Sequence, residues 1–233
     1  FFIAPKDRKG SNQDYVVAQV TRHPFPDGKA QAKITKNDSA VKAAGTAAGT
    51  AGDFRQEQAG RADVDTVTSD ISIIDIEKGA VIKNIPLANG SNALRGICLS
   101  LDGKYVFISH NLGRFQVPTT QLEQGWMNTS ALSVINVETL DYLATILLDE
   151  PEYGAAGSWG IDCNEDFIFV AHSGTHDFSK IDYQKFIDKL EIYPNKAKLA
   201  YDLRFLSGIR ERIKIEGNGP RILKTFNKNK NKE

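Results

Sequence analysis

Hydrophobic and polar residues alternate along this chain in short runs that predict β-strands. In residues 95–111, RGICLSLDGKYVFISHN, two runs rich in apolar and β-branched residues flank the turn-forming LDGK. The segments 131–137 (ALSVINV) and 142–148 (YLATILL) continue the same pattern after further polar stretches. Four short strands joined by polar turns are therefore predicted in this part of the chain.

The four-strand pattern repeats. ISIIDIEKGAVIKNIPL (71–87) matches LSVINVETLDYLATILL (132–148) without a gap, and GICLSLDGKYVFISH (96–110) matches GIDCNEDFIFVAH (160–172), which is shorter at its turn. A four-stranded unit that recurs about every 60 residues is typical of β-propeller blades with enlarged loops. The predicted fold class is all-β: a β-propeller of four-stranded blades, incomplete in this chain, with long loop insertions.

The N-terminal third departs from the regular repeat. Residues 1–29 contribute part of a first blade, in which QDYVVAQVTRH (13–23) is the expected second strand. Residues 30–69 are rich in Ala, Gly, Thr and charge and show no periodic apolar face. We therefore expect a mobile loop inserted between two strands of that blade.

The remaining blades are expected within residues 70–223. A helix-like insertion at 183–211 interrupts the last of them, and RERIKIEG (210–217) supplies its fourth strand. NGPRIL (218–223) is expected to begin a further first strand, and residues 224–233 form a tail rich in Lys and Asn. The pattern thus predicts a propeller that stops inside a blade.

RGICLSLDGKYVFISHN followed by LSVINVETLDYLATI resembles the YVTN-type β-propeller repeat, across residues 70–223 and more loosely across 13–28. SWGIDCNEDFIFVAHSGTH further resembles a bacterial, extracytoplasmic subgroup of these propellers. Some members of that subgroup lie beside, or are fused to, dihaem cytochrome c peroxidase-like domains. The resemblance implies a location in the periplasm or at the cell surface. The haem-attachment motif C-x-x-C-H does not occur in this chain.

Composition narrows the choice of partners. Lys+Arg and Asp+Glu both number 29, so no net charge favours nucleic acid. No apolar run approaches the ~20 residues that a membrane-spanning helix requires. The opening FFIAPKDRKG lacks the pattern of a signal peptide.

The two cysteines, Cys98 and Cys163, lie one position apart when the repeats are aligned. Successive side chains of a strand point to opposite faces of the pleat. We therefore expect the two thiols to point away from each other and to remain unbonded, as small buried apolar groups.

Strand parity indicates where a binding surface would lie. In a four-stranded blade the loops after the second and fourth strands emerge on one face. The long connections are mostly of this kind, the insertion at 183–211 excepted: 24–69, 88–95, 111–130 and 149–159. This loop face is the candidate binding surface, because binding residues gather on loops held by a rigid scaffold.

The histidines suggest a metal. His110 and His172 end equivalent second strands, His23 is assigned the same position in the first blade, and His176 follows closely. One interpretation is a divalent-metal site formed by His110, His172 and His176, because histidine is a common metal ligand. The other is that each histidine caps its strand by bonding loop backbone, with no cofactor bound.

The loop 111–130 contains Arg114, Phe115 and Trp126. Trp and Arg are the residue types that most often anchor a partner. The alternative is that the loop packs these side chains onto the propeller rim.

Two further features favour structural roles. Trp159, which aligns with Arg95 in the repeat, is expected to pack rather than bind. The acidic residues Asp149, Glu150 and Glu152 lack the spacing of an EF-hand and are expected to be solvated.

The leading functional hypothesis is a non-enzymatic propeller segment whose loop face binds a protein, a glycan or a small ligand. Its candidate binding residues are His110, Arg114, Phe115, Trp126, His172 and His176. The alternative is an accessory or catalytic propeller of an extracytoplasmic enzyme, either of the redox, cytochrome c peroxidase-associated kind or a metal-dependent lactonase. A third hypothesis is a truncated product without independent function. Open blade faces are expected to promote self-association.

Overall fold

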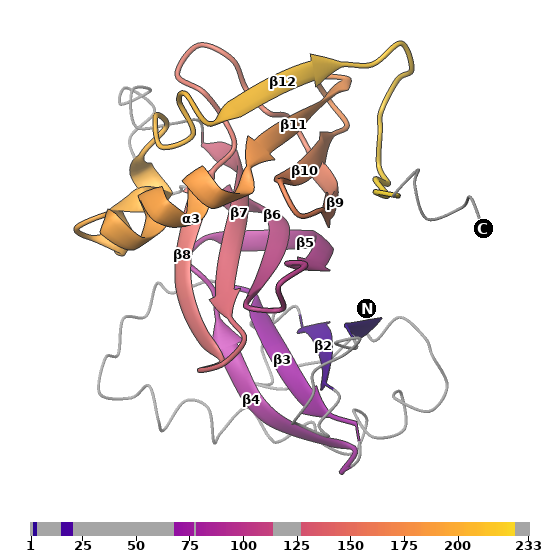
Figure 1. The fold of residues 1–233 in the computed structure, drawn as a ribbon, viewed down its shortest axis with the longest axis vertical. Helices are drawn as coiled ribbons and strands as arrows, with labels where there is room; N and C mark the ends of the chain where they lie inside the picture. Colours follow the sequence, from indigo (N-terminus) through magenta and orange to yellow (C-terminus); the bar gives the residue numbers. More distant parts are fainter. Residues whose placement is uncertain (1, 4–14, 21–67, 77, 114–126, 227–233) are drawn as a thin grey trace, which may run out of the picture. The chain divides into compact units, whose positions relative to one another are not determined.

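The strands form three four-stranded antiparallel sheets, in which spatial order follows chain order (Figure 1). The computed structural model describes the chain except for residues 1, 4–14, 21–67, 77, 114–126 and 227–233. Sheet 1 contains β1 (Phe2–Ile3), β2 (Tyr15–Val20), β3 (Asp70–Asp75) and β4 (Ala80–Pro86). Sheet 2 contains β5 (Ser91–Leu99), β6 (Tyr105–Gly113), β7 (Asn128–Asn136) and β8 (Asp141–Leu147). Sheet 3 contains β9 (Ser158–Cys163), β10 (Phe167–His172), β11 (Asp177–Asp182) and β12 (Arg210–Lys214).

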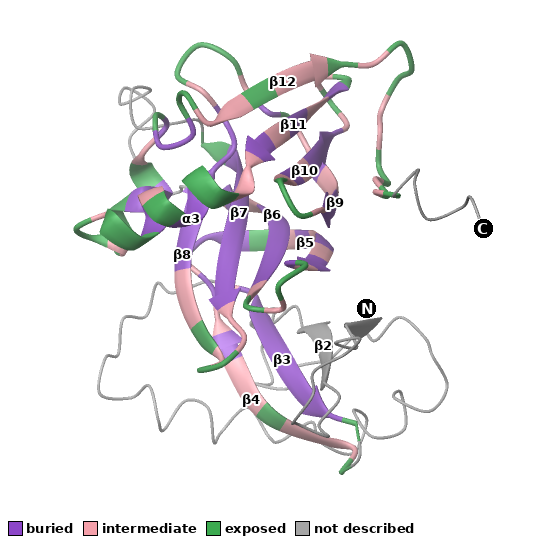
Figure 2. Ribbon diagram, viewed as in Figure 1, coloured by how far each residue is buried: buried purple, intermediate pink, exposed green. Residues whose placement is uncertain are grey.

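Helix is scarce in the described part of the chain, so the all-β prediction is confirmed, as is the prediction of four-stranded antiparallel units. The chain divides into two compact units, Phe1–Asn92 and Ala93–Glu233. In Figure 2 the strand β7 is buried along almost its whole length. The second unit contains the main apolar core, shared by sheets 2 and 3.

Sheet 1 places the predicted N-terminal strand as its second strand, β2. The register pairs Ala18 of β2 with Ser72 of β3. Residues 30–67 of the predicted mobile loop lie outside the described residues. At its end, the Thr68 hydroxyl donates to the carbonyl oxygens of Leu87 and Ala88, both at 3.0 Å. This contact ties the start of β3 to the end of β4.

The third strand of each sheet ends in a polar side chain that accepts hydrogen bonds from the backbone N–H groups of the turn or helix after it. In sheet 2, Asn136 Oδ1 accepts from the backbone N–H groups of Glu138 and Thr139, which closes the tight turn into β8. At the equivalent position of sheet 3, Asp182 Oδ1 accepts from the N–H of Lys185 and begins the helix α3 (Tyr183–Ile192). The predicted insertion at 183–211 thus contains α3 and the 3₁₀-helix η2 (Lys196–Tyr201).

The insertion contributes aromatic side chains to the core of the second unit. Phe186 of α3 packs edge-on against Phe107 of β6, with ring centroids 5.9 Å apart. Phe205, which follows η2, stacks edge-on against Phe186 at 5.7 Å. Such edge-to-face pairs add stabilisation beyond the burial of their area.

Sheets 2 and 3 approach closely at a repeated glycine. A Cβ atom placed on Gly96 of β5 would collide with the carbonyl oxygen of Trp159 in β9. A Cβ on the equivalent Gly160 would lie 2.7 Å from the carbonyl oxygen of Arg221. Glycine is required at both positions because backbone lies where a side chain would be.

The prediction of a strand at 218–223 is wrong for the described structure. This segment forms no β-ladder, because no described strand lies beside it to accept and donate hydrogen bonds. It nevertheless packs on Gly160 as the start of β9 packs on Gly96. The first residues of the predicted tail 224–233 are anchored too, since Thr225 N donates to Asp162 Oδ2 at 2.6 Å. Residues 227–233 lie outside the described residues.

The expectation that Cys98 and Cys163 point away from each other is also wrong. Both thiols are free and buried, and their sulfur atoms lie 2.7 Å apart. The two side chains do have opposite parity in their strands, as the alignment requires. Stacked sheets bring one face of the first against the opposite face of the next, so residues of opposite parity in successive repeats meet.

Candidate ligand-binding site

The two strand-end histidines are interior residues. His110 and His172 are both fully buried, which corrects their expected placement on the surface of the loop face. Nε2 of each ring lies 2.8 Å from a serine hydroxyl on the adjacent third strand, Ser133 for His110 and Ser179 for His172. Each histidine therefore ties the second strand of its sheet to the third.

Burial holds both imidazoles neutral. Loss of solvation lowers the pKa of His110 to about 4, although its Nδ1 also lies 2.9 Å from the Asn111 carbonyl oxygen. The pKa of His172 falls well below its usual value because of burial and then because of the charges of Arg212 and Arg210. In sheet 1 the register gives this position to Val20 rather than His23, which lies outside the described residues.

The predicted metal ligands do not converge. His110 and His172 belong to different sheets, and each is engaged with its own serine. His176 is exposed in a turn, where its Nδ1 accepts from the N–H of Gly219 at 2.9 Å. Within the described ranges no group of three His, Cys, Asp or Glu residues is arranged to hold a metal ion.

The predicted anchors Arg114, Phe115 and Trp126 lie outside the described residues. The described part of the loop face in the second unit is formed by the connection after β8, the turn after β10 and the segment after β12. Backbone hydrogen bonds join the first two of these, from Ser173 N to Gly157 O at 2.9 Å and from Gly174 N to Ala156 O at 2.8 Å.

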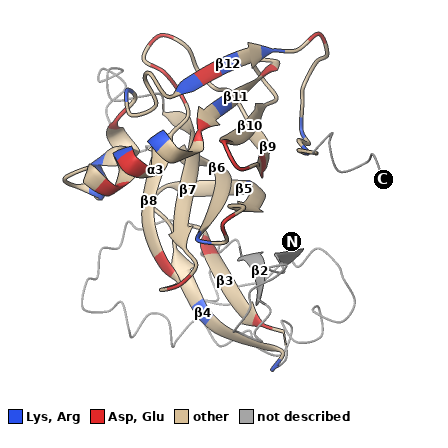
Figure 3. Ribbon diagram, in the orientation of Figure 1, with Lys and Arg blue, Asp and Glu red and all other residues tan. Residues whose placement is uncertain are grey.

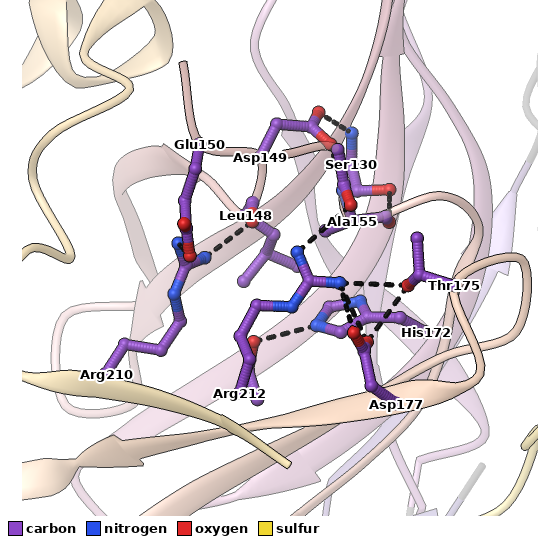
Figure 4. A network of polar contacts seen from close by, with 12 residues as sticks. Ser130, Leu148, Asp149, Glu150, Ala155, His172, Thr175, Asp177, Arg210 and Arg212 are labelled. Carbon is purple, nitrogen blue, oxygen red and sulfur yellow. Dashed lines mark hydrogen bonds and ion pairs between the residues drawn. The ribbon is translucent and has the colours of Figure 1, made fainter. Parts of the chain in front are cut away.

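A buried polar network holds the connection after β8 in place (Figure 4). Asp149 accepts the backbone N–H groups of Ser130 and Ala155, and Glu150 pairs with the guanidinium of Arg210. These contacts correct the expectation of a solvated acidic loop at Asp149 and Glu150, although Glu152 is exposed. The loop is thus fixed by specific contacts and not by apolar packing alone.

The network extends into sheet 3. Arg212 Nη2 lies 2.7 Å from the buried Asp177 carboxylate, and Arg212 Nη1 donates to the carbonyl oxygen of Gly154 at 3.0 Å. Figure 3 shows basic and acidic residues along β12, the strand that carries Arg210 and Arg212. Each of the two guanidinium groups thus faces an acidic partner.

Arg212 also lies over an aromatic ring, that of Tyr153, at 4.3 Å from its centroid. Two other arginines share a single ring. The guanidinium carbon of Arg95 lies 4.5 Å from the ring centroid of Trp159, and that of Arg221 lies 4.7 Å from it. Arg95 and Trp159 each precede a repeat glycine, and Arg221 continues this series. Trp159 is only partly buried, so the expectation that it packs is incomplete. Two guanidinium groups also lie over its ring.

The stack lies beside the loop face. A Cβ atom placed on Gly157 would lie 3.7 Å from Nη1 of Arg95 and 3.8 Å from the backbone nitrogen of Gly174. Neither Arg95 nor Arg221 forms an ion pair with an acidic side chain of the described residues. Burial and then the charge of Arg221 lower the pKa of Arg95. Two cations that repel each other next to an accessible indole favour a negatively charged ligand.

Sequence reasoning missed this stack, although a signal was present. RG at 95–96 aligns with WG at 159–160, and both align with the start of RIL at 221–223. The alignment shows that the three side chains occupy one repeat position. It does not show that these three side chains, which come from successive repeats, lie in contact.

Comparison with known proteins supports the fold. No family model matches the chain. The chain is homologous, at low identity, to hydrazine synthase subunit beta of Kuenenia stuttgartiensis: 24% identical over 124 residues, which are 52% of this chain and 32% of that protein. It also resembles the solved structure of Kuenenia stuttgartiensis hydrazine synthase, with a TM-score of 0.60 and 22% identity over 68% of this chain and 46% of that chain.

The protein is thus an all-β chain of repeated four-stranded antiparallel sheets that shares its fold with part of hydrazine synthase. It spans 32% of the curated relative and 46% of the solved chain. None of the helices in the described segments is both long and apolar enough to cross a membrane.

Proposed function

We propose that this chain is a non-enzymatic β-propeller segment whose loop face binds an acidic group of a partner protein. The observation that carries this proposal is the Arg95–Trp159–Arg221 stack beside the loop face. A glycan or small ligand that presents a carboxylate or phosphate would meet the same chemistry, and the experiment below separates these partners.

The propeller itself is supported by repetition of a contact. Sheets 2 and 3 have the same strand order, and the glycine contact between them recurs between Gly160 and Arg221. The likeness to the solved hydrazine synthase covers 68% of the chain. Each sheet then corresponds to one blade, and the loops after the second and fourth strands share one face.

The stack suits an acidic partner because of its geometry and charge. An arginine guanidinium binds a carboxylate through paired hydrogen bonds, and an indole contributes a large flat surface at little entropic cost. The hydrogen bonds of Asp149 and the pairing of Glu150 with Arg210 hold the neighbouring loop. Binding there would require little reordering of backbone. The predicted anchors Arg114, Phe115 and Trp126, together with the exposed His176, complete the proposed binding residues.

A protein partner is favoured over other ligands by the relative's name. Kuenenia stuttgartiensis hydrazine synthase subunit beta is by name one subunit of an enzyme. We extend to this chain the role of a subunit that contacts others. An extracytoplasmic location belongs to the same proposal and rests on the YVTN-type resemblance.

A second candidate is an accessory propeller within an extracytoplasmic redox enzyme, which rests on the YVTN-type resemblance. This function would use the same loop face for docking. It differs from the first in requiring a catalytic partner, or a divalent metal bound by this chain. Elemental analysis of the dialysed protein after incubation with Zn²⁺ or Ca²⁺ separates the two, because retention of one ion per chain supports the second candidate.

Binding can be tested with a fluorescent peptide of consecutive glutamates and a glutamine peptide of the same length. The wild-type chain should bind the acidic peptide, and its affinity should fall as salt is added. Arg95→Ala and Arg221→Ala should each weaken binding by about tenfold or more, because each removes an anchor. Arg204→Ala removes an exposed arginine of the insertion and serves as the matched control.

Loss of affinity in all three variants, or in none, would contradict the proposal, because net charge rather than the stack would then control binding. Inorganic phosphate and a sulfated oligosaccharide serve as competitors in the same assay. If phosphate or the oligosaccharide binds more tightly than the acidic peptide, the ligand of the loop face is a small molecule or a glycan and not a protein.

A further inference from the structure

Cys98 and Cys163 occupy facing positions on the first strands of sheets 2 and 3. Each side chain is 8% exposed, and the sulfur atoms lie 2.7 Å apart. These are the only cysteines in the sequence. Cys98 lies two residues after Gly96, where the backbones of β5 and β9 come into contact.

This separation is shorter than that of a relaxed pair of thiols. Non-bonded carbon atoms rest at ~3.5–4.0 Å, and sulfur is larger than carbon. A disulfide has sulfurs at ~2.05 Å and requires Cβ atoms that converge. The two sulfur atoms, 2.7 Å apart, lie between the contact distance and the bond length, so a short further approach would form the bond.

We propose that Cys98 and Cys163 form a disulfide that joins sheet 2 covalently to sheet 3. The bond would link residues 65 positions apart in sequence and would lie beneath the C-terminal segment. Thr225 covers this point, because its hydroxyl donates to the carbonyl oxygen of Cys163 at 3.1 Å and to Asp162 Oδ2 at the same distance.

Two other uses of a thiol pair fit the surroundings less well. A metal needs further ligands, and the described residues contain no group of three His, Cys, Asp or Glu that could hold one. A nucleophile needs a thiolate, but burial and the Cys163 thiol raise the pKa of Cys98 well above its usual value. A buried pair of thiols in contact is suited to a structural cross-link.

The oxidation needs an electron acceptor of the thiol–disulfide class, such as oxidised glutathione or a disulfide oxidoreductase. One cysteine thiolate attacks the acceptor's disulfide and forms a mixed disulfide, releasing one thiol. The second cysteine then displaces the remaining thiol, so two protons and two electrons leave the protein. Because both thiols are buried in the folded chain, where an oxidant cannot reach them, we place this reaction during folding, before the two sheets close. An oxidising compartment permits it.

The test begins with the wild-type full chain, refolded from denaturant with oxidised and reduced glutathione. Remaining thiols are then alkylated in denaturant and counted by intact mass. The expected product is a monomer without alkylation, lighter than the reduced chain by two hydrogen atoms. The same oxidation in persistent denaturant should give far less of this product, because the unfolded chain does not hold the two cysteines together.

Thermal unfolding provides a second measurement. Reductant should lower the melting temperature of the oxidised wild type by about 10 °C, from the chain entropy that a loop of this size removes and the size of the domain. The double variant Cys98→Ala/Cys163→Ala should not respond to reductant. Two alkylated cysteines per refolded chain, or a disulfide-linked dimer, would overturn the proposal, as would equal oxidation in denaturant.

Discussion

Phe107 of sheet 2 and Phe169 of sheet 3 hold the same position in the repeat but differ in burial. Phe107 is fully buried, with its ring 6.3 Å from Tyr183 and 5.9 Å from Phe186 of the insertion. Phe169 remains partly exposed, and its nearest ring, 6.1 Å away, belongs to Phe167 of its own sheet. The strand pattern assigns an aromatic side chain to a face, and the neighbouring element determines how far that face is buried.

The contrast continues at the next strand. Val134 in β7 is fully buried, whereas the equivalent Lys180 in β11 is partly exposed, with its ammonium group 4.4 Å from the Phe167 ring centroid. A lysine can lie there because its charged end reaches solvent along the aromatic surface. The face of sheet 3 that carries Phe169 is therefore less covered than the matching face of sheet 2, because the C-terminal segment packs on it only along β9, at Gly160 and Asp162. Among the described elements, none covers it as α3 covers Phe107.

Replacing the two phenylalanines tests this contrast most strongly. Phe107→Ala should lower the free energy of unfolding by about 3–5 kcal/mol, because it leaves a cavity beneath the insertion. Phe169→Ala should cost less than half as much, since its site is already open to solvent. Urea titration of both variants measures the difference. Equal losses would mean that the face of sheet 3 is covered in solution, as self-association through open blade faces would cause.

The second test concerns the residue opposite the third-strand serine. This residue is Thr145 in sheet 2 and Arg212 in sheet 3. Arg212→Ala should destabilise the chain by about 3 kcal/mol or more, because the buried Asp177 carboxylate loses its cation. Thr145→Ala should cost about 1 kcal/mol, the value of a neutral hydrogen bond to Ser133.

The Arg212 interpretation has a direct control. Arg212→Ala combined with Asp177→Asn removes both charges, so the double variant should recover part of the stability that the single variant loses. A double variant as unstable as the sum of the two single variants would show that the ion pair is not the source of the effect.

The third test uses pH. Burial lowers the pKa of His110 to about 4 in the folded chain, whereas an exposed histidine titrates near 6.5. Between these values the unfolded chain binds more protons than the folded chain, so stability falls as pH falls. The contribution of His110 is complete above pH ~6.5, and about 2 kcal/mol of it should be lost between pH 7 and pH 5.

Unfolding of the wild type and of His110→Gln at pH 7 and pH 5 checks this expectation. The variant should lose less stability over the interval, since glutamine does not titrate. The residual pH dependence is assigned to His172, whose pKa is lowered in the same direction. A variant with the same pH dependence as the wild type would show that His110 is not the group responsible.

The local pattern was sufficient to predict the strands, because alternation and turn residues act over a few positions. It predicted β8 to within one residue at each end, and β7 from its fourth residue onward. It could not predict that His110 is interior or that Cys98 meets Cys163, because both depend on how whole sheets stack. The strand at 218–223 failed for the same reason, since a strand exists only where a neighbour pairs with it. The stack at Trp159 needed the repeat alignment and the sheet contact together.

The smallest expected difference between sheets 2 and 3 lies at the ends of their third strands, at Asn136 and Asp182. Asp182→Ala should cost about 1 kcal/mol, because the first turn of α3 loses the acceptor that caps Lys185 N. Asp182→Asn keeps an acceptor while removing the charge that pairs with the mostly exposed Lys185 ammonium group, so it should cost at most a few tenths of a kcal/mol.

Asn136→Ala, at the matching turn of sheet 2, should cost less than Asp182→Ala, because its hydrogen bonds close an exposed turn that no helix follows. Urea unfolding of the three variants checks this order. A loss in Asp182→Asn equal to that in Asp182→Ala would assign the effect to charge, and the difference between hairpin and helix would then not lie in the cap.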